Sequence, residues 1–205
     1  MKKIASGLQY HVYDLGNGKV LKKETSKVYK LFKLISWTPY LIFKPNQLVR
    51  EINNSTKSTQ KCFNKLKNSN VDFTILGNPK FEDKKYKYIY TQDKVKILSS
   101  KVSCSEIDLY IESIFDNWKN GFCDEIFNFS KNSGIDKNGK VILIDLGELV
   151  FSKDEVLELI KIKRWLKSYS YFWISKDVKK YYVSHMEKNI TKENLNKYWN
   201  SINSF

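Results

Sequence analysis

The sequence predicts an α+β fold in two lobes, a small β-rich lobe with one helix followed by a reduced, mainly helical lobe. Three observations point to this fold: a glycine-turn hairpin near the start, short strand-like segments up to residue 92, and strong helix patterns after residue 100. The pattern changes within residues 93–101. We therefore expect the N-lobe at 1–95 and the C-lobe at 96–205.

The composition is that of a globular protein with an anionic partner. Of 205 residues, 41% are hydrophobic and 15% aromatic, which is enough for an ordinary core. The net charge of +14 predicts binding to a nucleotide, a nucleic acid, an acidic protein or a lipid headgroup. The three cysteines form no C-x-x-C pair, so neither a disulfide framework nor a zinc site is indicated. A reducing, cytoplasmic compartment is expected, and export without a signal sequence stays open.

Two segments have some features of membrane or targeting elements. The first ten residues carry the charges of a signal peptide but no continuous apolar core, so no removed segment is expected. Residues 31–43 are the most apolar stretch, but Lys33 and Pro39 interrupt it, and it is shorter than the roughly 20 residues of a spanning helix. We expect no transmembrane segment. Residues 31–43 either pack within the first lobe or form a docking element that contacts a partner or a membrane surface.

The first half of the chain shows two strands, a helix and two further strands. Residues 11–23 predict a hairpin with a Gly-Asn-Gly turn, because glycine can take positive φ. Residues 46–68 predict an amphipathic helix, because their apolar positions recur mostly at three- and four-residue spacing. Two more strands are expected at 71–77 and 86–92.

The second half is mostly helical. Ser103 with Glu106 forms a capping box ahead of a long apolar stripe, and Ser152 with Glu155 caps a second helix. A last helix is expected over residues 191–202. These helices surround a loop and a short β element.

That β element is GKVILIDLGELV, residues 139–150, an apolar run that ends on Asp145. A charge at the end of a buried strand must face water, a partner or a metal. Asp145 is therefore either a turn residue that hydrogen-bonds its own backbone or a ligand. Glu148, close behind it, is assigned no role.

In its first half the chain resembles the protein-kinase-like fold, in the small or atypical form of the aminoglycoside phosphotransferases. The segment that ends on Gly7 and leads to Val12 looks like a reduced glycine-rich loop. Lys22, ten residues after Val12, matches the lysine of the third strand. Glu51 stands where the family has the helix glutamate that pairs with this lysine.

In the second half, the Ile-Asp-Leu-Gly run around Asp145 resembles the magnesium-binding Asp-Phe-Gly motif. Asn132, thirteen residues earlier, matches the second metal-binding side chain of the family. The His-Arg-Asp motif is missing, because Phe127 occupies the position five residues before Asn132. The nearest carboxylate is Asp124, in a loop three residues longer than usual. The likeness covers about residues 4–150.

The resemblance implies phosphoryl transfer from ATP, with Mg²⁺, to a hydroxyl group. Asn132 and Asp145 would then hold Mg²⁺, Lys22 would bind the α- and β-phosphates, and Glu51 would orient Lys22. Asp124 would be the catalytic residue that accepts the hydroxyl proton. The remaining nucleotide-binding residues would be Gly7, Val12 and Gln92.

The phosphate acceptor is unidentified, with an acidic protein among the candidates.

Two other function classes stay open. Because the His-Arg-Asp motif is missing, the chain could instead be a pseudokinase, a nucleotide-binding or regulatory interaction module. A third reading, a basic nucleic-acid-binding protein, rests on the Lys-Tyr interleaving at residues 84–90 and 176–182. It is less favoured, because such runs are commonly solvated faces.

Overall fold

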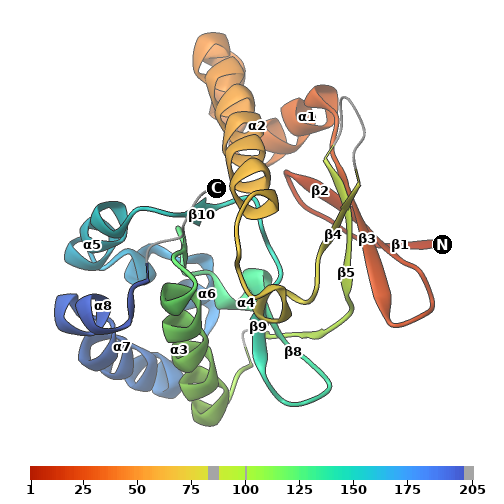
Figure 1. Ribbon diagram of the computed structural model, residues 1–205. Coiled ribbons are helices and arrows are strands. Elements are labelled where there is room, and N and C mark those ends of the chain that lie inside the picture. Colours follow the sequence, from red (N-terminus) through yellow and green to blue (C-terminus); the bar gives the residue numbers. More distant parts are fainter. Residues whose placement is uncertain (83–87, 100, 201–205) are drawn as a thin grey trace. The chain divides into compact units, whose positions relative to one another are not determined.

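The structure is a computed structural model that describes residues 1–82, 88–99 and 101–200 (Figure 1). The chain forms two compact units. Unit 1 comprises Met1–Lys67 and Pro79–Lys94, and unit 2 comprises Asn68–Asn78 and Val95–Phe205. Unit 1 is an antiparallel sheet with helices, and unit 2 is mainly helical. The predicted α+β class is confirmed, and its division into a sheet unit and a helical unit is consistent with a kinase-like fold.

Unit 1 is built on a five-stranded antiparallel sheet in the order β1-β2-β3-β5-β4. The predicted hairpin is confirmed as β2 and β3, and both turn glycines have positive φ. The predicted strand at 86–92 is β5, although residues 86 and 87 lie outside the described residues. The elements are β1 (Lys2–Ser6), β2 (Tyr10–Asp14), β3 (Lys19–Glu24), α1 (Lys27–Trp37), the 3-10 helix η1 (Pro39–Phe43), α2 (Pro45–Lys67), β4 (Lys80–Glu82) and β5 (Ile89–Asp93).

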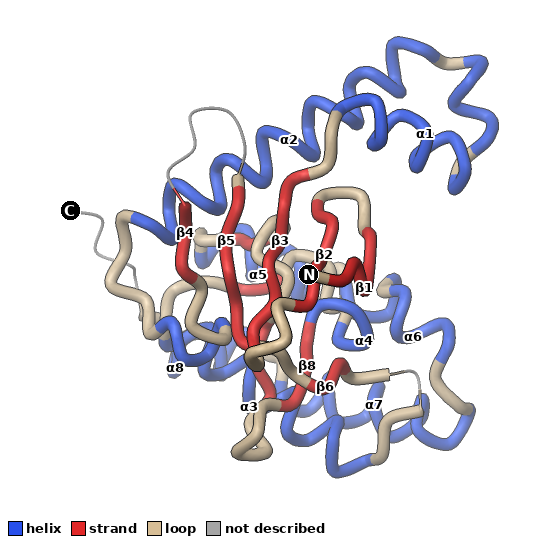
Figure 2. Tube along the Cα trace, turned by 90° about the vertical axis from the view of Figure 1, so that its right-hand side faces the viewer, coloured by secondary structure: helices blue, strands red, loops and turns tan. Residues whose placement is uncertain are grey.

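Helix α2 covers one face of this sheet, and Figure 2 shows the two side by side. The ring of Phe63 packs against Tyr10 and Tyr90, with centroid distances of 6.2 and 5.1 Å. Leu66, one turn further along, is completely buried. This packing accounts for the three- and four-residue spacing of apolar positions in α2.

The prediction of a single helix in the first lobe is wrong, because α1 precedes α2. Ser26 caps α1 by accepting a hydrogen bond from the amide of Tyr29. Lys30 points inward from α1, and its Nζ lies 3.1 Å from Glu24 Oε1 and 3.0 Å from Thr56 Oγ1. A fully buried ammonium is tolerated only with such partners. These contacts fix α1 to β3 and α2.

In unit 2, α7 (Lys176–Asn189) and α8 (Lys192–Tyr198) pack against α3 (Cys104–Lys119). Ile107 and Trp118 of α3 are both completely buried. Strands β6, β8 and β9 form one small sheet, and β7 pairs with β10. The elements are η2 (Phe73–Leu76), β6 (Lys96–Ile97), α3 (Cys104–Lys119), β7 (Cys123–Asp124), α4 (Phe129–Asn132), β8 (Ser133–Ile135), β9 (Val141–Leu143), β10 (Leu149–Val150), α5 (Lys153–Lys161), η3 (Arg164–Lys167), α6 (Tyr169–Trp173), α7 (Lys176–Asn189) and α8 (Lys192–Tyr198).

The helices predicted after Ser103, after Ser152 and near the end of the chain are confirmed as α3, α5 and α8. Ser103 and Glu106 form the expected capping box. Helix α8 ends at Tyr198, before the predicted end at residue 202, which lies outside the described residues. Capping residues and apolar periodicity therefore located the longer helices correctly.

The strand predicted at 71–77 is wrong, because this segment forms the 3-10 helix η2. The side chain of Asp72 accepts a hydrogen bond from the amide of Thr74, and Gly77 ends the helix in the left-handed conformation. Ile75 and Leu76 are buried, as they would be in a strand. A short apolar run carries no period that separates the two structures.

All three cysteines are free thiols, and Cys104 is the exposed one. Within residues 1–82, 88–99 and 101–200, no helix has both the length and the apolar character required to cross a membrane.

Candidate functional site

Three residues singled out in the sequence, Asp124, Asn132 and Asp145, lie together in unit 2. Asp124 ends β7, and its partner across the strand pair is Leu149 of β10. Asn132 ends α4, and its carbonyl accepts hydrogen bonds from the amides of Ile144 and Asp145 at 2.7 and 3.4 Å. Backbone contacts therefore bring the Asp145 loop next to both other residues.

The carboxylate of Asp124 is the most elaborately bonded group of this site. It accepts hydrogen bonds from the amides of Ile126 and Asn128 at 3.2 and 3.1 Å. The side-chain Nδ2 of Asn132 donates to both of its oxygens at 3.2 and 3.3 Å. Asp124 is only 5% exposed. These bonds fix its orientation.

Asp145 also has a structural bond, since its Oδ1 accepts the amide of Gly147 at 3.1 Å. Asp145 therefore does hydrogen-bond its own backbone in a turn. This bond is compatible with a ligand role, because a carboxylate has two oxygens and several lone pairs.

Burial, reinforced by neighbouring carboxyl groups, raises the pKa of two acids in this site. Burial, opposed by the amides of Ile126 and Asn128 and reinforced by Asp145, raises the pKa of Asp124 to about 7. Burial, with Asp145 and then Asp124 adding to it, raises the pKa of Glu148 to about 8. A carboxyl group with a pKa near neutrality is suited to accept a proton during a reaction.

Asn132 and Asp145 fit a cation that is shared with another ligand. Because the Nδ2 of Asn132 is used by Asp124, its Oδ1 is the atom that can face a cation. This amide oxygen and the Asp145 carboxylate are hard donors of the kind Mg²⁺ prefers, and Mg²⁺ commonly completes its shell with water and phosphate. Among the residues that the structure describes, no group of three or more His, Cys, Asp and Glu could hold a metal. These two donors would leave the rest of a cation's coordination shell to water and phosphate oxygens.

The loop between Asp124 and Asn132 accommodates the three residues by which this segment exceeds the usual spacing. Phe127, at the position of the missing family aspartate, has a φ of 50° and is completely buried. Its ring packs edge-on against Trp165 at 5.9 Å. A left-handed conformation is uncommon for a bulky residue. The longer loop thus wraps around the Asp124 carboxylate and anchors itself in the core through Phe127.

Sequence reasoning missed the polar network that supports this loop. Ser170 Oγ of α6 donates to Asn128 Oδ1 at 2.6 Å, and the amide of Ser130 donates to Ser170 Oγ at 2.9 Å. Nothing in the sequence links residues so far apart. Glu148 did carry a signal, since it directly follows the Asp-Leu-Gly motif, and its carbonyl accepts the amide of Glu125 at 3.0 Å.

In unit 1, three residues assigned to nucleotide binding share one face of the sheet. Val12 lies opposite Lys22, and Lys22 lies opposite Tyr90. Gln92 is two residues beyond Tyr90 and points to the same face. Lys22 is 7% exposed, with its Nζ 5.5 Å from the centre of the Tyr90 ring. Its cation–π contact and burial distinguish Lys22 from an ordinary surface lysine.

The structure gives less support to Gly7 and Glu51. The amide of Gly7 donates to the Tyr10 carbonyl at 2.9 Å, in the turn between β1 and β2. A Cβ at Gly7 would meet only that carbonyl, at 3.9 Å, so the fold does not require glycine there. Glu51 is half-buried on α2 and forms no ion pair within the described residues, whereas Lys30 and Glu24 of the same unit form a buried pair. The roles of Gly7 and Glu51 stay predictions.

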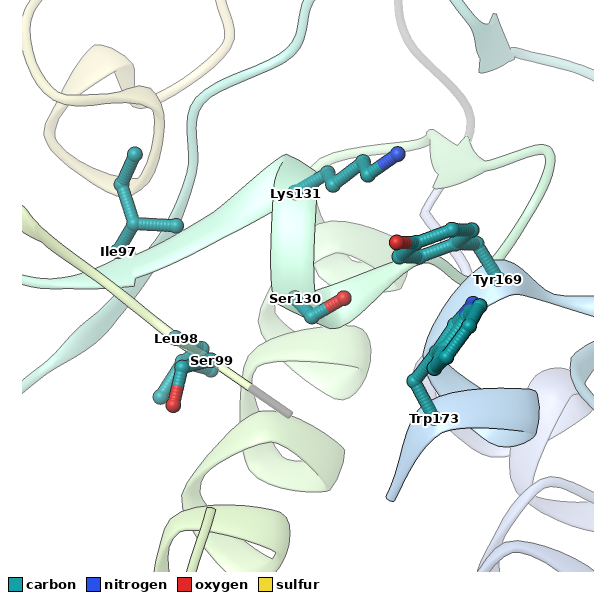
Figure 3. Close-up of a pocket in the computed structure, with 7 residues that line it drawn as sticks. All are labelled: Ile97, Leu98, Ser99, Ser130, Lys131, Tyr169 and Trp173. Atoms are coloured by element: carbon teal, nitrogen blue, oxygen red, sulfur yellow. The ribbon is translucent and has the colours of Figure 1, made fainter. Parts of the chain in front are cut away.

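A cavity of about 350 Å³ opens beside α4 (Figure 3). Its lining residues are Ile97, Leu98, Ser99, Ser130, Lys131, Tyr169 and Trp173. The rings of Tyr169 and Trp173 lie 5.8 Å apart, and Lys131 Nζ lies 3.6 Å from the centre of the Tyr169 ring. Ser130 and Lys131 directly precede Asn132. A small molecule in this cavity would therefore contact the helix that carries Asn132.

Sequence comparisons give no relative for this chain: no protein-family model and no curated protein matches it. Among the solved structures that match are three at 13–14% identity. A 2.2 Å crystal structure of WbdD matches with a TM-score of 0.41 over 76% of this chain and 34% of WbdD. The bifunctional kinase-methyltransferase WbdD, in a medium-resolution structure, matches with 0.42 over 92% and 42%. Rv3197 from Mycobacterium tuberculosis, in complex with erythromycin, matches with 0.43 over 91% and 53%.

This chain therefore spans between about a third and about half the length of these structures.

Proposed function

We propose that this chain is a compact atypical kinase, which transfers the γ-phosphoryl group of ATP to a hydroxyl group of an unidentified acceptor. One observation carries the proposal. Asn132 donates to both oxygens of the Asp124 carboxylate, while its carbonyl binds the amides of Ile144 and Asp145. A buried proton acceptor thus stands beside two oxygen donors for a cation, which is the arrangement that phosphoryl transfer requires.

The residues of unit 2 would divide the chemistry between them. The Asn132 Oδ1 and the Asp145 carboxylate would hold Mg²⁺, which supplies charge neutralisation at the phosphates when bound. Asp124 would accept the proton of the acceptor hydroxyl. As that oxygen forms its bond to the γ-phosphorus, the bond to the β–γ bridging oxygen breaks and ADP leaves.

The residues of unit 1 would position the nucleotide. Lys22, a cation on the sheet face shared with Val12 and Gln92, would pair with the α- and β-phosphates. Glu51 would orient Lys22, and the backbone around Gly7 would cover the phosphates. These assignments follow from the resemblance and from the shared sheet face.

A pseudokinase is the second candidate, and Phe127 is the observation that favours it. A buried phenylalanine occupies the position where the family carries its catalytic aspartate. If Asp124 does not reach an acceptor hydroxyl from its longer loop, the same site would bind a nucleotide without transferring phosphate. The chain would then act as a nucleotide-dependent interaction module.

Thermal melting with ATP and Mg²⁺ tests nucleotide binding, which both candidates require. At about 100 times the dissociation constant, a ligand adds about 2.7 kcal/mol to the free energy of unfolding. For a chain of this size, that corresponds to a rise in Tm of roughly 5–10 °C. ATP with EDTA and AMP with Mg²⁺ are the matched controls, because each lacks one part of the metal–triphosphate unit. An unchanged Tm at saturating Mg·ATP would contradict both candidates.

Incubation with γ-labelled ATP then separates the two candidates. A kinase forms ADP and a labelled product, whereas a pseudokinase that passes the melting test leaves the nucleotide intact. Candidate acceptors should include acidic proteins, because the chain carries a net charge of +14.

A further inference from the structure

Exposed apolar side chains are concentrated in one part of unit 1. In the described part of the chain, fourteen large hydrophobic side chains are exposed, and seven of them lie within residues 28–49, hereafter the docking segment. They are Val28, Phe32, Trp37, Tyr40, Ile42, Phe43 and Val49. Phe32 is 66% exposed and Phe43 is 86% exposed. A concentration of this kind marks a contact site more often than chance exposure does.

The exposure is not a consequence of a poorly formed core. The docking segment has its own small core, in which Leu41, Leu48 and Ile52 are buried against partly buried residues of α1. Lys30 is buried as well, with its amine on Glu24. The segment thus has a formed interior, and seven further large apolar side chains remain outside it. Folding of α1, η1 and α2 therefore leaves the apolar side chains for another partner.

The docking segment is basic and carries no acid. Residues 28–49 hold Lys30, Lys33 and Lys44 and no Asp or Glu, and Lys30 is the one already paired with Glu24. Some of these cations stand beside the exposed rings. Lys33 Nζ lies 5.2 Å from the Trp37 ring, and Lys44 Nζ lies 5.6 Å from the Tyr40 ring. Apolar and cationic groups are therefore presented together.

We propose that unit 1 docks on an anionic lipid surface through the docking segment. Trp and Tyr favour the headgroup level of a bilayer, and lysines beside them pair with anionic lipids. Phe32, Ile42 and Phe43 would enter the boundary between headgroups and acyl chains, as the apolar side of an interfacial helix does. A nucleic acid would match the cations and rings but offers no apolar phase for Val28, Ile42 and Val49. The proposal is independent of the kinase function.

Vesicle flotation with the whole chain tests this proposal. The probes are vesicles of phosphatidylcholine alone and of phosphatidylcholine with phosphatidylserine. The wild type should float with the anionic vesicles and not with the neutral ones, and added salt should weaken the association. The double variant Phe32→Ser/Phe43→Ser should bind the anionic vesicles at least about tenfold more weakly.

Phe172→Ser is the matched control, because Phe172 is a 63% exposed phenylalanine of unit 2. It should bind like the wild type, and all variants should melt like the wild type. The proposal is overturned if the wild type ignores anionic vesicles, if the double variant binds undiminished, or if Phe172→Ser loses as much binding. Loss of single-stranded RNA binding in the double variant, without vesicle binding by the wild type, would instead assign the segment to a nucleic acid.

Discussion

Replacing Asp145 with asparagine is expected to lower phosphoryl transfer on the order of a thousandfold. Asparagine keeps the size of the side chain and an oxygen that can accept the Gly147 amide, which Asp145 binds at 3.1 Å. It removes the negative charge that would hold Mg²⁺ beside Asn132. The measurement is the initial rate of label transfer from γ-labelled ATP, to an acceptor or to water.

Asp177→Asn is the control for this variant, since Asp177 is an exposed acid in the first turn of α7. It should leave the rate unchanged. Asp145→Asn should melt close to the wild type in EDTA, which would show that the loss does not come from unfolding. Equal transfer rates for Asp145→Asn and the wild type would remove Asp145 from the site.

The second large effect is a dependence of stability on pH that Asp124 causes. Its pKa is 3.8 in an unfolded reference and about 7 in the fold, chiefly because of burial. Between these values the unfolded chain is ionised while the folded chain keeps the proton, so the free energy of unfolding falls as pH rises. The loss from Asp124 totals roughly 4 kcal/mol between about pH 4 and pH 7, and it levels off above the folded pKa.

Asp124→Asn removes this titration, so the stability difference between wild type and variant should shrink or reverse as pH rises from about 4 to 7. Urea denaturation without metal or nucleotide measures the free energy of unfolding of both proteins at each pH. Tryptophan fluorescence is a suitable signal, because four of the five tryptophans belong to unit 2. Glu148 adds a loss in the same direction up to about pH 8 in both proteins. If the free energies of unfolding of the wild type and of Asp124→Asn changed in parallel with pH, the raised pKa of Asp124 would be contradicted. The control is Asp154→Asn, which replaces an exposed acid of α5 and should follow the wild type.

Much of the fold could be predicted from local signals. The Gly-Asn-Gly turn fixed the β2–β3 hairpin, and the capping serines Ser103 and Ser152 marked the starts of α3 and α5. Such features act within a few residues and are visible in a sequence. The apolar run at 71–77 lacked a period, and the capping bond from Thr74 to Asp72 decided it in favour of a 3-10 helix.

The site was predictable only in part, for a physical reason. The spacing of Asn132 and Asp145 reflects a turn between two adjacent strands, β8 and β9, and a local turn leaves a local signal. The bond between Asn132 and Asp124 depends on how an unusual loop folds around a carboxylate, which no spacing rule describes. The support from Ser170 to Asn128 arises from packing between segments that are distant in sequence.

The buried ion pair of unit 1 also arises from packing that leaves no local signal in the sequence. The resemblance assigns Glu51 to a buried lysine. The buried ion pair that the structure shows in unit 1 joins Lys30 to Glu24, with Thr56 as a further partner, and it depends on the packing of α1 against α2. Leu31, Leu34 and Ile35 recur at helical spacing, but this period does not indicate that a lysine beside them faces inward. A burial pattern therefore has to be seen in three dimensions before such a pair can be assigned.

Asn132 and Asp145 are proposed to hold a divalent cation on a bound nucleotide, beside Asp124. Paramagnetic broadening of backbone amide signals by Mn²⁺ with a non-hydrolysable ATP analogue locates this cation, because Mn²⁺ accepts the same oxygen ligands. Amides around residues 132 and 145 should broaden first in the wild type and stay sharp in Asp145→Asn. First broadening at acids elsewhere, or undiminished broadening around residue 132 in Asp145→Asn, would contradict this proposal.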